Sequence, residues 1–211
     1  MFEITPFFPG IIAAYAILLV GASSPGPSVA MVIGVATRQG RTSALTATLG
    51  IALGSVTINI LTMLGVGLIL SQAAWMMSLL RIIGAAYLLY LSYGAFKRVL
   101  NPSEFQSVKT DSNSLLRLFI SGYLLQVTNP KTISFWLAIA SIGAVEGAAA
   151  GVIILFIFGA FLISFVCHGA WAVVLSVQHI REIYNAKRKW IEAALGSFLA
   201  FAAYKLASSE N

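Results

Sequence analysis

Six long apolar runs, separated by short polar connections, make up most of the chain. They cover residues 9–37, 44–70, 75–96, 118–142, 148–177 and 190–207. Each run reaches or approaches the ~20 residues that a helix needs to cross a hydrocarbon core about 30 Å thick. The runs do not alternate with a period of two, so they predict helices and not the strands of a membrane barrel. We therefore expect an all-α integral membrane protein with six transmembrane helices.

Composition excludes a soluble globular protein. Of the 211 residues, 59% are hydrophobic and only 9% are charged, whereas soluble domains carry about 25% charged residues. The first run has no basic segment before it and is too long for the apolar part of a signal peptide, so we expect it to remain as a span.

Basic residues gather in alternate connections between the spans. Ten of the 13 lysines and arginines lie between spans 1 and 2, 3 and 4, or 5 and 6. They are Arg38, Arg41, Lys97, Arg98, Lys109, Arg117, Arg181, Lys187, Arg188 and Lys189. The positive-inside rule puts these connections in the cytoplasm and both termini outside. The net charge of +6 is thus explained by topology, and we expect no nucleic-acid partner.

Prolines interrupt two of the spans. The sequence is SPGP at positions 24–27 and NPK at 129–131. A proline has no N–H and clashes with the carbonyl four residues earlier, so we expect free carbonyls at Gly21, Ser23 and Gln126. Helices 1 and 4 are therefore predicted to be broken. Broken backbone is tolerated at membrane depth only where it faces protein or a water-filled cavity.

The two breaks occupy matching positions in two similar halves. Pro25 and Pro130 are 105 positions apart, as are Gly54 and Gly159. Three spans is an odd number, so the second half must enter the membrane upside down. Broken helices at matching positions of inverted repeats indicate the binding site of a secondary transporter. The predicted units are the repeats 1–100 and 117–211, joined by a cytoplasmic linker at 101–116.

Each break creates a half-helix N-terminus, which favours anions, beside carbonyl groups, which favour cations. A cavity with both suits a zwitterion. Prolines can also merely kink a membrane helix, but two breaks in register favour a site. The candidate substrate-binding residues are Ser24, Pro25, Gly26, Pro27, Ser28, Gln126, Asn129, Pro130 and Lys131.

Three buried polar residues have open roles. Lys131 lies deep in span 4, where a charge costs several kcal/mol unless it is partnered. Its partner is either a substrate carboxylate or the free carbonyls of helix 1, and it is a candidate for proton coupling. His168 could relay protons, although a lone helical histidine is more often hydrogen-bonded to a neighbour. Asn59 either faces the cavity or makes an interhelical hydrogen bond.

Four motifs together resemble those of the LysE/RhtB amino-acid exporters, in order and in spacing, over essentially the whole chain. They are SPGP, RQGR (38–41), GAAYLLYL (84–91) and NPK. The resemblance implies export of amino acids across the bacterial inner membrane, driven by an ion gradient, usually of protons. It also implies that residues 25–27 and 129–131 form the two halves of the pathway.

The substrate is expected to be a neutral amino acid of small to medium size. No Asp or Glu lies near the midplane of the spans to pair with a second positive charge, and the predicted lining, which includes Trp136, is apolar with a few hydroxyls. The alternatives are an exporter of another small solute such as a metal cation, for which carboxylate ligands are missing, and a non-transporting scaffold. No enzyme motif is present and no cofactor is expected. Small-residue spacing at Gly50 and Gly54 allows close packing, within the chain or in a homo-oligomer.

Overall fold

The structure of the chain is a computed structural model, which describes residues 4–208 apart from residue 25 and the segments 73–74, 101–113 and 175–176. Two predictions are affected. Pro25, a predicted site residue, lies outside the described residues, and only residues 114–116 of the predicted linker are described.

The described residues form one short 3-10 helix and seven α-helices, with no strand. In chain order these are η1 (Thr5–Phe7), α1 (Phe8–Ser23), α2 (Pro27–Gln72), α3 (Trp75–Leu100), α4 (Leu115–Val127), α5 (Pro130–Ala140), α6 (Ala150–Val174) and α7 (Gln178–Ala207). The prediction of an all-α protein is confirmed. Among the described residues, three helical segments are long and apolar enough to cross a membrane, namely Thr5–Ser23, Pro27–Gly65 and Ala150–Val174.

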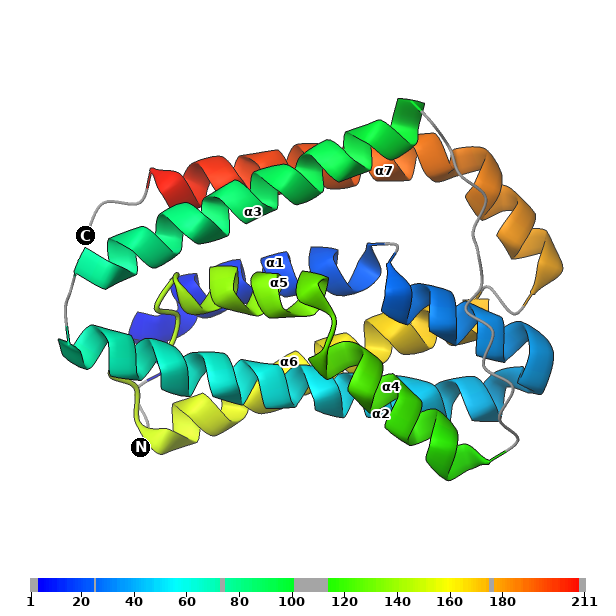
Figure 1. Cartoon of the computed structure of the whole chain (residues 1–211), viewed down its shortest axis with the longest axis horizontal. Helices are drawn as coiled ribbons and strands as arrows, with labels where there is room; N and C mark the ends of the chain where they lie inside the picture. Colours follow the sequence, from blue (N-terminus) through cyan, green and yellow to red (C-terminus); the bar gives the residue numbers. More distant parts are fainter. Residues whose placement is uncertain (1–3, 25, 73–74, 101–113, 175–176, 209–211) are drawn as a thin grey trace.

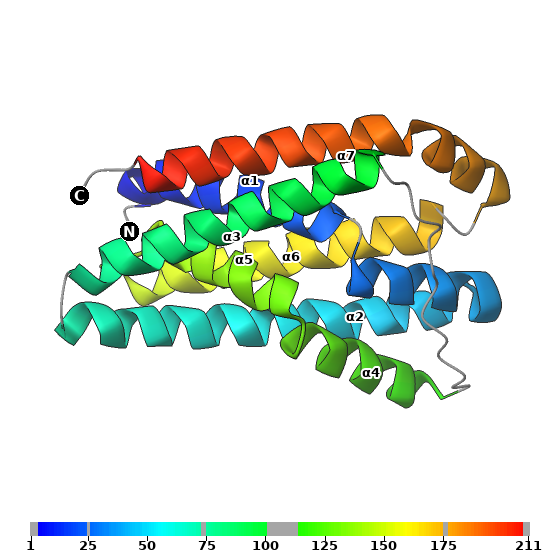
Figure 2. The same cartoon turned by 45° about the horizontal axis from the view of Figure 1, so that its top comes forward.

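The helices lie roughly along one long axis (Figure 1). Helices α3 and α7 pack side by side on one face, and α2 packs against both α4 and α6 (Figures 1 and 2). Both termini lie at one end of the bundle, together with the turn between α5 and α6. The bend in α2 and the starts of α4 and α7 lie at the opposite end. Among the described residues, the basic positions that the sequence places in alternate connections therefore gather toward one end of the molecule, while Lys109 lies outside the described residues.

Helix α2 contains two predicted spans in one element. Its backbone leaves the helical region at Gly40, where φ is 82° and ψ is 179°, and the chain turns back there (Figure 1). Glycine adopts this positive φ without a steric penalty. Residues 27–39 thus correspond to the second half of the predicted first span, and residues 41–72 to the predicted second span.

Two helices are longer than the apolar runs from which they were predicted. Helix α3 continues beyond residue 96 to Leu100, and α7 begins at Gln178, twelve residues before the predicted span. Hydropathy detects where apolar side chains stop, whereas the backbone hydrogen bonds continue through amphipathic turns. Glu192, which is near the start of the predicted span 190–207, consequently lies in the middle of α7 and is completely buried.

Large apolar side chains cover the outside of the bundle and polar side chains lie inside it. Ile12 and Ile154 are each 65% exposed, while Ser55, Asn59 and Ser164 are buried. This distribution is the reverse of that in a soluble domain, and it fits a bundle surrounded by lipid.

The glycines with small-residue spacing pack inside the chain. A Cβ on Gly50 would collide with the backbone of Phe119 in α4, and one on Gly54 would lie 2.9 Å from the carbonyl oxygen of Tyr123. These glycines therefore allow α2 and α4 to approach each other closely, which answers the question left open by the sequence.

Candidate functional site

The two helix breaks are both present, and each has a local cause. Helix α1 ends at Ser23, and Ser24 follows with extended backbone angles of −76° and 139°. Helix α5 begins at Pro130, whose missing N–H needs no acceptor at a first helical position. The side chain of Asn129 caps that helix, because its Oδ1 accepts a 3.0 Å hydrogen bond from the backbone N–H of Lys131.

Side chains join one break to the other. The Ser28 hydroxyl, in the first turn of α2, donates to Oε1 of Gln126 at 2.5 Å. The Asn129 amide nitrogen donates to the same hydroxyl oxygen at 3.4 Å. All three side chains are buried. The structure therefore brings together two segments that lie about a hundred residues apart in the sequence.

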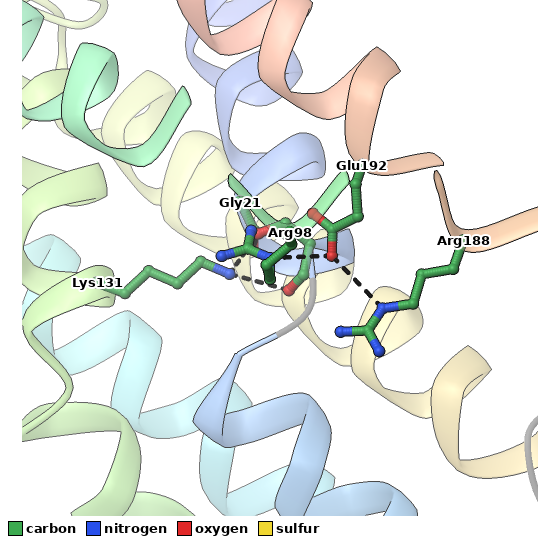
Figure 3. A network of polar contacts seen from close by, with 6 residues as sticks. Gly21, Arg98, Lys131, Arg188 and Glu192 are labelled. Carbon is green, nitrogen blue, oxygen red and sulfur yellow. Dashed lines mark hydrogen bonds and ion pairs between the residues drawn. The ribbon is translucent and has the colours of Figure 1, made fainter. Parts of the chain in front are cut away.

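Lys131 caps the broken end of α1. Its Nζ donates a 2.9 Å hydrogen bond to the carbonyl oxygen of Ser24 and a second one to the Ser24 hydroxyl oxygen (Figure 3). That hydroxyl in turn donates to the carbonyl of Gly21 at 3.2 Å. Gly26 faces the same ammonium group, since a Cβ there would lie 3.2 Å from Nζ. Lys131 therefore contacts a carbonyl at the end of helix 1, which is one of the two partners proposed for it from the sequence.

The expected set of free carbonyls needs correction. The carbonyl of Gly21 is not free, because it accepts from the Ser24 hydroxyl. The carbonyl of Gln126 is not free either, because it accepts from the backbone N–H of Asn129 at 3.3 Å. The chain tightens into a turn after Val127, and this turn satisfies the group that Pro130 would otherwise leave unpaired. Gln126 contributes its side chain to the site, not its backbone.

A small cavity with polar and apolar walls lies beside the joined breaks. It has a volume of about 30 Å³ and is lined by residues from α1, α2, α4, α5 and α6, including Ser24, Gly26, Ser28, Gln126, Asn129 and Lys131. This volume holds about two water molecules. The cavity must therefore widen before it can hold an organic solute.

Three residues that complete the lining carry hydrogen-bonding groups. His168 is buried, and its Nδ1 lies 2.8 Å from the carbonyl of Ser164, four residues earlier on α6. A carbonyl can only accept, so Nδ1 carries the hydrogen and the neutral ring presents Nε2 as an acceptor. The hydrogen bond to a neighbour, which we favoured from the sequence, is therefore present, and His168 also lines the cavity. Ser164 and Ser55 were not predicted, because isolated mid-helix serines carry no distinctive sequence signal.

Trp136 forms one wall of this cavity. Its indole is 1% exposed, and Nε1 donates to the Ser55 hydroxyl at 3.0 Å. Trp136, which the sequence predicts in the lining of the substrate site, thus lies at this cavity.

A partly buried ionic cluster that the sequence did not predict lies close to Lys131 (Figure 3). The Glu192 carboxylate pairs with Arg98 at 3.0 Å and approaches Arg188 at 3.9 Å. Arg98 and Lys131 line a cavity of about 210 Å³ together with Ser24 and Gly26. The sequence indicates only a topological role for Arg98. Its ion-pair partner, Glu192, lies 94 positions later in the chain, on α7.

Comparison with known proteins gives a consistent result. A family model described as LysE type translocator matches residues 19–210. The "Threonine efflux protein" of Escherichia coli (strain K12) is 28% identical over 192 residues, covering 86% of this chain and 89% of that protein. The protein of the same name from Salmonella typhi is 27% identical over the same shares. "Uncharacterized membrane protein YahN" of Escherichia coli (strain K12) is 23% identical over 183 residues, covering 87% and 82%. No solved structure matches the chain.

Proposed function

We propose, from the premise that this chain belongs to the family of LysE type translocators, that it is a secondary active exporter of neutral amino acids of small to medium size. It would act in the inner membrane of a bacterium and couple export to an ion gradient, with protons as the coupling ion. The observation that carries the proposal is the Lys131 ammonium held on a backbone carbonyl at the point where the two broken helices meet.

The Lys131–Ser24 contact has the chemistry to bind a zwitterion. A substrate carboxylate would take the Lys131 ammonium in a charge-assisted hydrogen bond, which is stronger than the bond to a neutral carbonyl. The Ser24 carbonyl would then be free to accept from the substrate ammonium. Each group that loses a partner gains another, so an amino acid can replace the closed contact without leaving a buried charge unpaired.

The lining of the central cavity favours a neutral side chain. No Asp or Glu is found among its residues within the described chain, and the nearby Glu192 is paired with arginine. A lysine or arginine substrate would bring a second positive charge that has no counter-ion. The names of the relatives, threonine efflux protein, agree with a neutral substrate.

Contacts between equivalent positions support the proposed inverted repeat. Gly26 and Lys131, which are 105 positions apart, face each other across the site. Gly54 packs against α4, and its counterpart Gly159 packs against Tyr15 of α1. These are the contacts that a two-fold axis through the breaks would generate. With the basic end of the bundle in the cytoplasm, both termini would lie outside.

Proton coupling requires a group that gains and loses a proton during the cycle. Lys131 and His168 are the candidates, since both line the central cavity. The remaining predicted site residues would shape the pathway: Ser24, Pro25, Gly26 and Pro27 on one side, and Ser28, Gln126, Asn129 and Pro130 on the other.

Radiolabelled efflux tests the proposal. Cells that overproduce the protein are loaded with a mixture of threonine, homoserine, leucine, lysine and arginine, and loss of each label is followed with and without a protonophore. We expect the neutral amino acids to leave fastest and the protonophore to stop their export. Faster export of lysine would refute the substrate class. No change in any amino acid would favour the alternatives, and resistance to a divalent metal would then separate a metal exporter from a scaffold.

A further inference from the structure

A second and larger cavity lies on the other side of Trp136. It has a volume of about 320 Å³, and Trp136 belongs to the lining of both this outer cavity and the small central one. Small-molecule sites typically have volumes of about 300–1,000 Å³. The outer cavity, unlike the central one, therefore has room for an amino acid without any rearrangement.

The outer cavity leads toward the end of the bundle at which both termini lie. It shares Gly143, Ala144, Glu146 and Gly147 with an open depression of about 590 Å³. These residues form the turn between α5 and α6 (Figure 1). The free volume thus widens from the joined breaks, past Trp136, to that end of the molecule.

Asn59 is the polar residue deep in this space, whose other charged or amide-bearing lining residue is the exposed Glu146 of the α5–α6 turn. Its side chain is completely buried and lines the outer cavity. Neither its Oδ1 nor its Nδ2 has a hydrogen-bond partner among the described residues. An unpaired buried amide costs about 1–3 kcal/mol. The interhelical hydrogen bond considered from the sequence is therefore absent among the described residues, and the buried amide would reach a molecule in the cavity after a turn of its side chain.

Asn59 lies one helical turn beyond Ser55 on α2. Residues four apart share a helix face. The Ser55 hydroxyl, which accepts from the Trp136 indole, and the Asn59 amide therefore lie on the same side of α2. A solute that displaced the indole from Ser55 would meet Asn59 next.

We infer that the outer cavity is a second binding site for the exported zwitterion, with Asn59 as its polar anchor and Trp136 as the partition between the two sites. The amide oxygen accepts from the substrate ammonium, and the amide N–H group donates to its carboxylate. The apolar walls accommodate a neutral side chain. This inference rests on the proposed function and adds to it a site between the helix breaks and the exit.

A thiol placed in the outer cavity can report its occupancy. Met63 lines this cavity four residues after Asn59, and Cys167, the chain's single cysteine, can be removed as Cys167→Ala. In the Met63→Cys, Cys167→Ala protein, we measure the rate of modification by a small hydrophilic methanethiosulfonate. We expect saturating threonine or homoserine to slow the reaction several-fold, and the corresponding amine without a carboxylate to have little effect.

Asn59→Leu in the same background tests the anchor. Losing a hydrogen bond to a charged group weakens binding by about 1.5–3 kcal/mol, so the protecting concentration should rise about tenfold or more. Leucine removes an unpaired polar group, and folding should not suffer. Thr62→Val is the matched control, because the Thr62 hydroxyl is already bonded to the carbonyls of Ile58 and Asn59, and protection should remain unchanged.

Export measured in the same proteins separates the two hypotheses. Continued amino-acid export with no protection at position 63, or with equal protection in Asn59→Leu, would overturn the outer site and leave the proposed function standing. Absence of both export and protection would overturn the proposed function, and the outer site with it.

Discussion

Replacing Lys131 by methionine removes the ammonium and keeps most of the side-chain volume. Two hydrogen bonds to Ser24 are lost, each worth about 1.5–3 kcal/mol because the donor is charged. Against this, a charge deep in a membrane protein costs about 2.5–3.5 kcal/mol by insertion scales. The two effects largely offset each other, so the free energy of unfolding should fall by no more than about 3 kcal/mol and the protein should still insert and fold.

Transport should be impaired even though the protein still folds. A carboxylate that loses its charge-assisted hydrogen bond loses about 1.5–3 kcal/mol of binding, which corresponds to a rise of about 10- to 150-fold in KM. The assay is threonine or homoserine export from membrane vesicles, with expression and thermal unfolding measured on the same preparations. Lys97→Met is the control, because Lys97 is exposed in the last turn of α3 and its loss makes the same change in net charge.

A Lys131→Met protein that is well folded and exports amino acids with an unchanged KM would refute this reasoning. Lys131 would then serve only to cap the broken end of α1. A fall in export that merely follows a fall in expression would likewise count against a role in binding.

Three further predictions use other parts of the structure. Periplasmic reporters fused after Glu146 should be active and those after Gln106 silent; the reverse pattern would invert the proposed orientation. Gly50→Ala should destabilise the protein by about 1–3 kcal/mol through overpacking against α4, while Gly65→Ala, with open space around it, should leave the melting temperature unchanged. Glu192→Gln should destabilise by less than the 3–5 kcal/mol of a fully buried pair, because the Arg98 side chain is 35% exposed; an unchanged melting temperature would deny the ion pair a structural role.

The parts of the fold that depend on local covalent chemistry could be predicted from the sequence. Pro27 and Pro130 begin new helices as expected, because a missing N–H disrupts a helix whatever lies around it. The fate of the Gln126 carbonyl could not be predicted in the same way. It depends on how the chain turns after Val127, and several turns are compatible with a following proline.

Contacts between side chains on distant helices could not be predicted from the sequence. Hydropathy ends the third span before Arg98, which therefore resembled an ordinary topological charge. Its side chain turns inward only because Glu192 is buried on the packed neighbour α7. The Ser55–Trp136 hydrogen bond is of the same kind, since neither residue indicates its partner across 81 positions.

The proposed replacement of the contact between Nζ of Lys131 and the carbonyl oxygen of Ser24 by a substrate has a stereochemical consequence. The two groups would each hold one end of the zwitterion, the carboxylate or the ammonium, which are two of the four substituents of the substrate Cα. The side chain and the hydrogen would then occupy the two remaining directions, and mirror-image substrates exchange them. Two contacts do not distinguish mirror images by themselves, so the wall of the cavity, which includes Phe135 and Trp136, must supply the third. A protein that works in this way is expected to distinguish L from D amino acids by which substituent meets that wall, and to handle glycine without any such preference.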